Sequence, residues 1–242
     1  MGLSGIAHAA TIGTDNASAS AYGDGWTSGD NGVITGNGFG AWTITANQAG
    51  GYSGAFTDTS TRVGGNIDSS GKSFILYEDT DSSASVDAAR SFSSALNAGQ
   101  GFSIDLVSNY GDGNRGIDIK DGSNNTILNV NDNGTNYNVN NATTGGGTAF
   151  GGYDGNTIVH FAITQTSAAG GSWSISRSGG TSAGPVSGTY TGLASGFNLY
   201  LNGVSFAADG NKFAFNNLAV VPEPATLGLL GLGAIGLLRR RK

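Results

Sequence analysis

Cysteine is absent from this 242-residue sequence, so neither a disulfide framework nor a thiolate metal site can form. Charged residues are also scarce, at 12% of the chain where about a quarter is usual. Four of the eleven Lys and Arg residues occupy positions 239–242, which leaves seven basic against seventeen acidic residues, a balance of −10. Because so acidic a body repels phosphate backbones and anionic lipid, we expect no nucleic-acid partner.

Proline is rare too, with three residues, whereas glycine occurs 43 times. Gly, Ser, Thr and Asn fill the positions that Lys, Glu and Arg usually take on the surface of an intracellular protein. This composition suits an extracellular β-protein better than a cytosolic enzyme. The length allows one β-rich domain with a hydrophobic core of its own.

Between positions 26 and 221, short segments of alternating apolar and polar residues are separated by Gly, Asn, Asp and Ser, which predicts strands joined by turns. In the segment that begins at Gly101, for example, Phe102, Ile104 and Leu106 share one face of a strand. The predicted strands are 41–45, 73–78, 101–106, 116–120, 126–131, 157–164, 172–177, 197–201 and 212–220.

Hairpin turns are predicted at dipeptides that accept the positive φ of a type I′ turn. These are Asp121-Gly122, Asn133-Gly134, Asn202-Gly203 and Asp209-Gly210. The segment Ala84–Ala98 has an alanine content and spacing that fit either one or two helical turns or a strand.

Many short strands without amphipathic helices between them predict an all-β domain, an antiparallel β-sandwich that is jelly-roll-like or concanavalin-like. A β-solenoid is the alternative fold, because chains rich in Gly, Asn and Ser also build solenoids. The core positions include Trp42 and Trp173, which alternate with apolar neighbours, whereas Trp26 is the one tryptophan expected in a loop.

The N-terminal segment Ala7-His8-Ala9 has the small-x-small form of a signal-peptidase site, and a polar Ser/Asn/Gly-rich stretch follows it. We interpret residues 1–9 as the remnant of a signal peptide whose start lies upstream. The expected organisation is then a signal-peptide remnant at 1–9, a β-sandwich domain at 10–221 and a C-terminal signal at 222–242.

The C-terminal segment has three parts in fixed order: Pro222-Glu223-Pro224, a fourteen-residue apolar run, and the cluster Arg239, Arg240, Arg241 and Lys242. The two prolines hold the backbone extended and unable to join a sheet. As a helix, the apolar run spans about 21 Å, short of the roughly 30 Å hydrocarbon thickness. The basic cluster orients this end towards the cytoplasm, which leaves the body outside.

This arrangement resembles the PEP-CTERM sorting signal of Gram-negative bacteria that make extracellular polysaccharide, over about the last twenty residues. The resemblance implies a transient hold in the inner membrane through a C-terminal hydrophobic helix. It also implies processing near Pro222, Glu223 and Pro224 by exosortase, an integral-membrane protease. The expected location is therefore the cell envelope, the cell surface or the extracellular matrix.

The body offers little catalytic chemistry. His160 is its one histidine, and a Ser-His-Asp triad has no Gly-x-Ser-x-Gly elbow to support it. Glycoside hydrolysis needs two carboxylates across a cleft, whereas Glu78 is the one glutamate of the body and Asp79 would point to the opposite face of its strand. We expect no catalytic residues and no enzyme.

Three turns place an aromatic residue beside an aspartate in a glycine loop, at 22–26, 110–114 and 153–156. Flat aromatic rings and Asp or Asn side chains bind sugars, and loops often carry such sites. The candidate ligand-binding residues are Trp26, Tyr110, Asp112, Tyr153 and Asp154. The simpler interpretation is that these are hairpin turns whose tyrosines cover the ends of the sandwich.

The oxygen atoms of these turns are of the type that calcium prefers, but no EF-hand spacing is present. We therefore expect no cofactor and no metal, with calcium as a weak alternative. The function expected first is a non-enzymatic structural or adhesive component of a polysaccharide matrix. A lectin-like carbohydrate-binding module is the alternative. A glycoside hydrolase or lyase acting on polysaccharide comes third.

Overall fold

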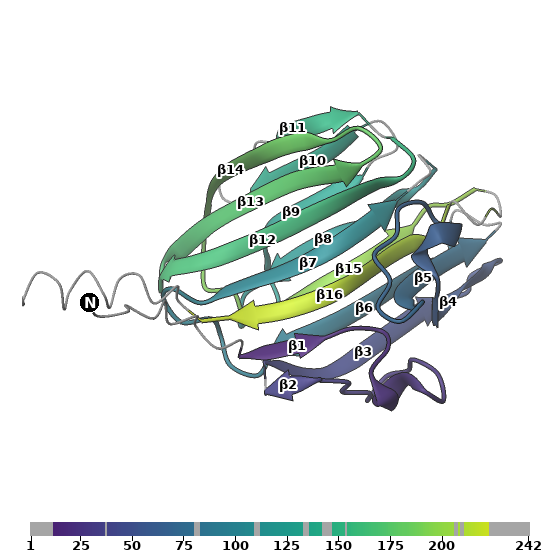
Figure 1. Cartoon of the computed structure of the whole chain (residues 1–242), viewed down its shortest axis with the longest axis horizontal. Helices are drawn as coiled ribbons and strands as arrows, with labels where there is room; N and C mark the ends of the chain where they lie inside the picture. The colour runs from purple at the N-terminus through teal and green to yellow at the C-terminus, as the bar shows by residue number, and fades with distance from the viewer. Residues whose placement is uncertain are drawn as a thin grey trace, which may run out of the picture.

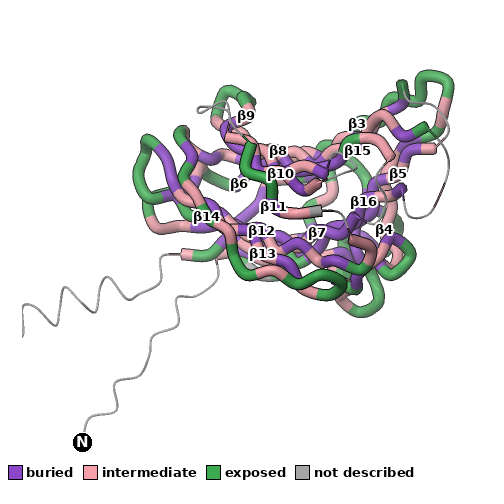
Figure 2. Tube along the Cα trace, turned by 90° about the horizontal axis from the view of Figure 1, so that it is seen from above, coloured by how far each residue is buried: buried purple, intermediate pink, exposed green. Residues whose placement is uncertain are grey.

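The computed structural model describes residues 12–36, 38–79, 83–108, 112–132, 136–141, 147–152, 154–205, 208 and 211–222. Two antiparallel sheets pack face to face over these residues (Figure 1). Viewed from above, the sheets form separate layers, and buried residues occur along the strands of both layers (Figure 2). The prediction of an all-β chain with two antiparallel sheets is confirmed, and the arrangement is not that of a solenoid.

In the described part of the chain, the first sheet has nine strands, in the order β14-β13-β12-β7-β16-β1-β2, with β5 pairing with β16 and β4 with β5. Its strands are β1 (Gly13–Asp15), β2 (Thr35–Gly36), β4 (Tyr52–Asp58), β5 (Ser73–Asp79), β7 (Gly101–Ser108), β12 (Thr157–Ser167), β13 (Gly170–Gly179), β14 (Ala183–Thr191) and β16 (Phe213–Val221).

The second sheet has seven described strands, in the order β11-β10-β9-β8-β15-β6-β3. Its strands are β3 (Phe39–Asn47), β6 (Ser85–Phe92), β8 (Asn114–Lys120), β9 (Thr126–Asp132), β10 (Asn136–Asn141), β11 (Gly147–Gly152) and β15 (Gly196–Asn202). The described helices are two short 3-10 turns, η1 (Ser20–Tyr22) and η2 (Ser60–Arg62). No helix in the described residues has the length and hydrophobicity to span a bilayer, and the expected C-terminal helix lies outside them.

The core forms because the inward positions of both sheets are apolar. On β7, for example, Phe102, Ile104 and Leu106 are buried, as their alternation predicts. Phe102 stacks on Phe197 of the second sheet with ring centroids 4.8 Å apart. Trp42 is also buried here, so its assignment to packing is confirmed.

A smaller apolar cluster lies on the outer side of the first sheet. The segment 59–72, which contains η2, packs Val63 and Ile67 against Ile75, Val107 and Ala214. This segment therefore covers part of the outer face of β5, β7 and β16, and it leaves the rest of that face accessible.

The segment Ala84–Ala98 is a strand over β6, not a helix. Its inward positions are Val86, Ala88, Arg90 and Phe92, all buried. Arg90 fits there because Asp15 forms an ion pair with it in which both side chains are fully buried.

Two of the predicted hairpin turns differ from expectation. In the turn between β8 and β9, the positive φ belongs to Asn124 (65°) and not to Gly122, because the Asp121 carboxylate accepts bonds from the backbone N–H groups of Ser123 and Asn125. Gly203 does have positive φ (75°), but it follows β15 on a crossing to the other sheet. The other two dipeptides lie outside the described residues.

The described ends of the body lie together. The Ile12 backbone N–H donates to the Val220 carbonyl at 2.9 Å, and Pro222 directly follows the last strand, β16. Pro222 therefore lies at the end of the sandwich opposite Phe213, where β16 begins.

Candidate functional site

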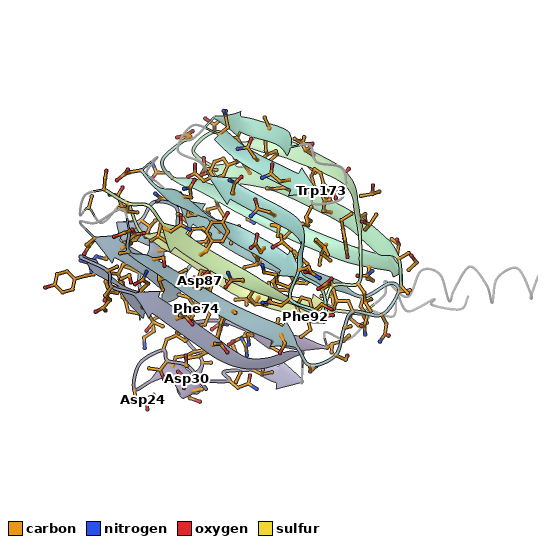
Figure 3. The ribbon with its side chains drawn as sticks, turned by 180° about the vertical axis from the view of Figure 1, so that it is seen from behind. Asp24, Asp30, Phe74, Asp87, Phe92 and Trp173 are labelled. Atoms are coloured by element: carbon orange, nitrogen blue, oxygen red, sulfur yellow. The ribbon has the colours of Figure 1, made fainter. Side chains whose placement is uncertain are left out.

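The outward positions of five neighbouring strands of the second sheet carry amide and carboxylate side chains. The strands are β6, β15, β8, β9 and β10, which lie side by side in that part of the sheet in the order β10-β9-β8-β15-β6. Each of these side chains is partly exposed, and Asp87 is labelled in Figure 3. We call this surface the asparagine face; its residues are Asp87, Asp118, Asn129, Asn131, Asn140, Asn198 and Tyr200.

A chain of hydrogen bonds fixes the centre of the asparagine face. The Asn129 side-chain N–H₂ donates to Asp118 Oδ1 at 2.8 Å and to the Tyr200 hydroxyl at 3.0 Å. Asn140 in turn donates to Asn129 Oδ1 at 2.9 Å and to Asn131 Oδ1 at 3.1 Å. These bonds cross β15, β8, β9 and β10, so the side chains are held in one orientation before any ligand arrives.

The neighbouring part of the face has an acceptor without a partner. Asn198 donates to Asp87 Oδ1 at 2.7 Å, but its own Oδ1 is buried and accepts no hydrogen bond in the structure. Buried acceptors are usually satisfied by protein, water or ligand. This oxygen lies beneath the surface of the face, so the partly exposed side chains around it are the groups that a ligand can contact.

Tyr200 lies across β8 because the residue opposite it is glycine. Tyr200 pairs with Gly116 in the register of β15 and β8, and a Cβ atom at Gly116 would lie 2.8 Å from the Tyr200 hydroxyl and 2.2 Å from the Val130 carbonyl oxygen. Burial, as the main cause, raises the pKa of Tyr200 to about 12. The phenol therefore stays neutral and can both donate and accept.

A hollow of about 250 Å³ continues the same face towards the other end of β8 and β15. Both small and polar residues line it, including Ala41, Ala89, Ser91, Gly196, Lys120 and Asn124. This volume is just below the range of pockets for drug-sized ligands. The hollow has the size for one small ring with polar substituents, bound beside the hydrogen-bonded side chains around Asn129 and Tyr200.

The chemistry of the asparagine face matches a ligand rich in hydroxyl groups. A hydroxyl both donates and accepts, as an Asn side chain does, and carboxylates supply further acceptors. Two carboxylates, Asp87 and Asp118, stand beside one cation, Lys120, whose Nζ is 3.1 Å from Asp118 Oδ2. This balance favours a neutral ligand over an anionic one.

The loop residues expected from the sequence do not form this site. Trp26 is 3% exposed; its ring packs edge-on against Trp42 and tilted against Phe74, with ring centroids 5.2 Å and 4.8 Å apart. Its expected place in a ligand-binding loop is therefore wrong. The loop that carries Trp26 folds over the core, so this side chain is buried although it lies outside any strand. Alternation of apolar and polar residues identifies buried positions in strands but not in loops. Trp173 is buried, as expected for a packing residue.

Asp112 and Asp154 lie in loops at the end of the sandwich away from Pro222. The Asp112 carboxylate accepts from the backbone N–H of Ser205 at 2.8 Å, and Asp154 accepts from the Thr181 hydroxyl. Each aspartate thus ties two neighbouring loops together. Among the described residues, no three His, Asp or Glu side chains converge as a metal site.

The other expected site residues, Tyr110, Tyr153, Glu223, Pro224, Arg239, Arg240, Arg241 and Lys242, lie outside the described residues.

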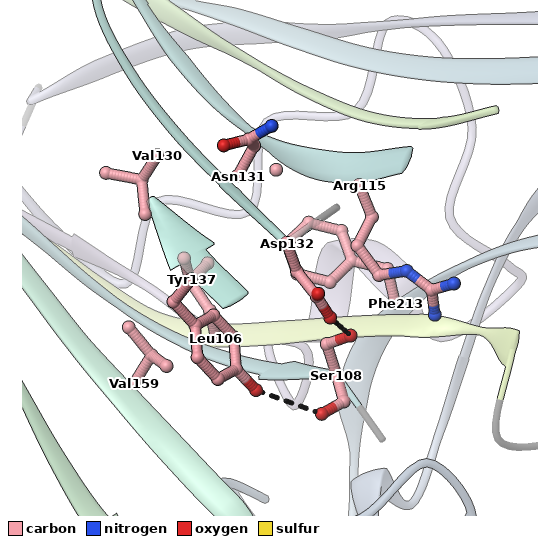
Figure 4. Close-up of a pocket in the computed structure, with 10 residues that line it drawn as sticks. Leu106, Ser108, Arg115, Val130, Asn131, Asp132, Tyr137, Val159 and Phe213 are labelled. Atoms are coloured by element: carbon pink, nitrogen blue, oxygen red, sulfur yellow. Dashed lines mark hydrogen bonds between the residues drawn. The ribbon is translucent and has the colours of Figure 1, made fainter. Parts of the chain in front are cut away.

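A buried polar cluster near those loops encloses a cavity of only about 10 Å³ (Figure 4). Within it, the Ser108 hydroxyl donates to Asp132 Oδ2 at 2.7 Å, and the Tyr137 hydroxyl donates to the Ser108 carbonyl at 3.2 Å. This space is about that of one water molecule, so the cluster is too small to bind a substrate.

The fold and the asparagine face define a β-sandwich protein with a preformed polar surface. Residues 220–242 match the family model of the PEP-CTERM protein-sorting motif. The chain therefore carries a PEP-CTERM sorting motif at its C-terminal end, as the sequence predicts. This motif implies an exported protein that is handled at the cell envelope and processed by the membrane protein exosortase.

No curated protein matches the sequence. Among solved structures, the body is similar to one titled "Sialidase", with 14% identity and a TM-score of 0.45, over 75% of this chain and 16% of that one. It is also similar to the binding domain of botulinum neurotoxin serotype G, with 12% identity and a TM-score of 0.43, over 88% and 48% of the two chains.

A third structure is the enzymatically active domain of tailspike protein 4 of bacteriophage CBA120, with 12% identity, a TM-score of 0.30 and coverage of 74% and 19%. The chain spans less than half the length of each of the three structures.

Proposed function

We propose that this protein is an adhesive component of the cell surface or extracellular polysaccharide matrix. Its body, a concanavalin-like sandwich, binds neutral polysaccharide on the asparagine face without cleaving the glycosidic bonds. The observation that carries the proposal is the hydrogen-bonded row of amides and carboxylates around Tyr200. The sorting motif supports the proposed location, where such polymers occur.

On this proposal the C-terminal segment holds the protein in the inner membrane of a Gram-negative bacterium until exosortase cuts near Pro222. The mass of the intact protein exported by its native host tests this step. A species that ends upstream of Ala225 supports processing, whereas a persistent Lys242 terminus contradicts it.

Affinity electrophoresis in gels that contain xylan, galactomannan, dextran or alginate tests the binding. We expect retardation by at least one of the neutral polymers and none by alginate. Tyr200→Ala should abolish the retardation, because it removes the hydroxyl that Asn129 binds. Tyr52→Ala is the matched control, since Tyr52 is 68% exposed and lies on β4 of the other sheet.

Equal mobility of the wild-type protein in all gels would overturn the proposal. So would a retardation that Tyr200→Ala leaves unchanged, because the polymer would then bind elsewhere. The lectin-like and adhesive interpretations share this site. They differ in the ligand, because an adhesive component binds the polymer of its own matrix. Gels that contain polysaccharide purified from the host test this difference.

A further inference from the structure

A serine, a histidine and an aspartate from three neighbouring strands are connected on the outer face of the first sheet. His160 Nδ1 lies 2.7 Å from Asp105 Oδ1, and His160 Nε2 lies 2.6 Å from Ser178 Oγ. The strands β7, β12 and β13 are adjacent, and Asp105 pairs directly with His160. All three side chains are partly exposed, so a reactant can approach them from solvent.

This geometry is that of an activated nucleophile. A hydroxyl within hydrogen-bond reach of an imidazole, whose other nitrogen is held by a third group, defines a Ser-His-Asp triad whatever the fold or the order in sequence. If Nδ1 carries the proton, it donates to Asp105. Nε2 is then free to accept the Ser178 proton.

A strained residue orients the aspartate. Asn217 has a φ of +56° and lies in an irregular part of the pairing between β16 and β7. Its side-chain N–H₂ donates to Asp105 Oδ2 at 2.9 Å, and its Oδ1 accepts from the Ser69 hydroxyl at 3.0 Å. Bulges that redirect a side chain, and non-glycine residues with positive φ, concentrate at functional sites.

The triad has a wall on one side and a hollow on the other. Ile158, two residues before His160 on the same face, packs against the apolar cluster under segment 59–72. Ala162, two residues after His160, lines a hollow of about 370 Å³ whose other residues include Thr164, Ser172, Ser174 and Ser187. Residues two apart on a strand are about 7 Å apart, so a group seated in the hollow lies next to His160. A substrate that extends from the hollow past His160 reaches Ser178, which pairs with Ile158.

We propose that Ser178, His160 and Asp105 form an acyl-transfer site that hydrolyses carboxylic esters, with O-acyl groups on polysaccharide as the substrate class. The polysaccharide part of this assignment rests on the proposed function, whereas the ester chemistry rests on the triad alone. Ser178 and His160 are the catalytic residues. Asp105 and Asn217 are positioning residues.

In the first step, Ser178 Oγ bonds to the ester carbonyl carbon while its proton passes to His160 Nε2. The bond from that carbon to the sugar oxygen then breaks, and His160 returns the proton to the departing hydroxyl. Water attacks the acyl-serine, its proton passes through His160 to Ser178 Oγ, and the carboxylic acid leaves. The net reaction consumes one ester and one water and needs no other reactant.

The first test is covalent labelling of the full chain with a fluorophosphonate probe, followed by peptide mapping. We expect labelling at Ser178, none in Ser178→Ala, and a rate at least about 100-fold lower in His160→Gln, the usual contribution of a general base. Ser176→Ala is the matched control, because Ser176 lies two residues away on the same strand and outside the hydrogen-bonded triad.

The second test is acetate release from acetylated xylan, measured on the same four proteins with their thermal unfolding as a check of folding. We expect release by the wild type and Ser176→Ala, and a loss of at least about 100-fold in the other two. Labelling absent from Ser178, labelling that survives His160→Gln, or a failure to release acetate would overturn the proposal. Retention on polysaccharide gels, which depends on the opposite sheet, should persist in Ser178→Ala.

Discussion

Replacing Glu78 by Gln is expected to remove a large part of the pH dependence of stability. The Glu78 carboxyl is fully buried; its Oε1 accepts from the backbone N–H of Val204 at 3.1 Å, and its Oε2 has no hydrogen-bond partner. Burial raises the pKa of Glu78 from 4.5 to about 7, because desolvation outweighs the backbone donors at Val204 and Gly203 and the charge of Arg115.

The sign follows from proton binding. Between about pH 4.5 and 7 the folded protein keeps the proton on Glu78 while the unfolded chain has lost it, so the free energy of unfolding falls as the pH rises through this window. At 1.36 kcal/mol for each factor of ten in the acid constant, the loss is about 3 kcal/mol. Glu78→Gln should not show it. Asp15, whose pKa burial also raises, remains in both proteins and cancels in the comparison.

The assay is urea unfolding, followed by tryptophan fluorescence, of the wild type and Glu78→Gln at a series of pH values from 4 to 8. The variant should gain about 3 kcal/mol relative to the wild type across the series, which corresponds to roughly 6 to 12 °C in Tm for a domain of this size. A difference between the two proteins that stays constant with pH would refute the reasoning.

Three further substitutions test the packing. Arg90→Met should destabilise the protein by about 3 to 5 kcal/mol in urea unfolding, because it leaves the Asp15 carboxylate buried without its cation. Recovery of stability in the double variant with Asp15→Asn would confirm this cause. An unchanged unfolding midpoint for Arg90→Met would contradict it. Trp26→Ala should cost about 3 to 5 kcal/mol by opening a core cavity, whereas a near-zero cost would place that ring outside the core. Gly116→Ala should lower the free energy of unfolding by about 1 to 3 kcal/mol and abolish glycan retention, because the added methyl group overlaps the Val130 carbonyl oxygen and the Tyr200 hydroxyl. Gly122→Ala is the control that should change neither property, because a methyl group there makes only ordinary contacts.

The strands of the core were predictable because their alternation is strong. On β12, for example, Val159, Phe161 and Ile163 occupy the inward positions and are buried. By contrast, β10, β11 and β14 went unpredicted, since Asn, Gly and Pro185 are typical of turns and are depleted in strands. These segments become strands because they pair with neighbouring strands, as β10 does with β9 and β14 with β13. Such pairing depends on the whole fold and not on the local sequence.

The asparagine face was missed for the same reason. Asn129 and Asn131 flank Val130, and Asn138 and Asn140 flank Val139, so an alternation of amide and apolar residues was present in the sequence. The strand 126–131 was predicted, but the segment around Val139 was not, because its asparagines are typical of turns. The alignment of β15 with β8, which brings Tyr200 to Asn129, depends on register and could not be read from one sequence.

The connection of Ser178, His160 and Asp105 was also beyond sequence reasoning. These residues are 18 and 55 positions apart in the chain, and neither spacing has a local signature. His160 points away from the core, because it alternates with the buried residues Val159 and Phe161. Its partners come from the pairing of β12 with β7 and β13.

The central claim is that polysaccharide binds on the asparagine face, and hydroxyl-radical footprinting tests it most directly. The protein is oxidised with and without the polymer that retards it in gels, and the modification of each tyrosine is measured by mass spectrometry. We predict that the polymer lowers the oxidation of Tyr200 several-fold and leaves that of Tyr52 unchanged. Unchanged oxidation of Tyr200 while the polymer is bound would contradict the claim.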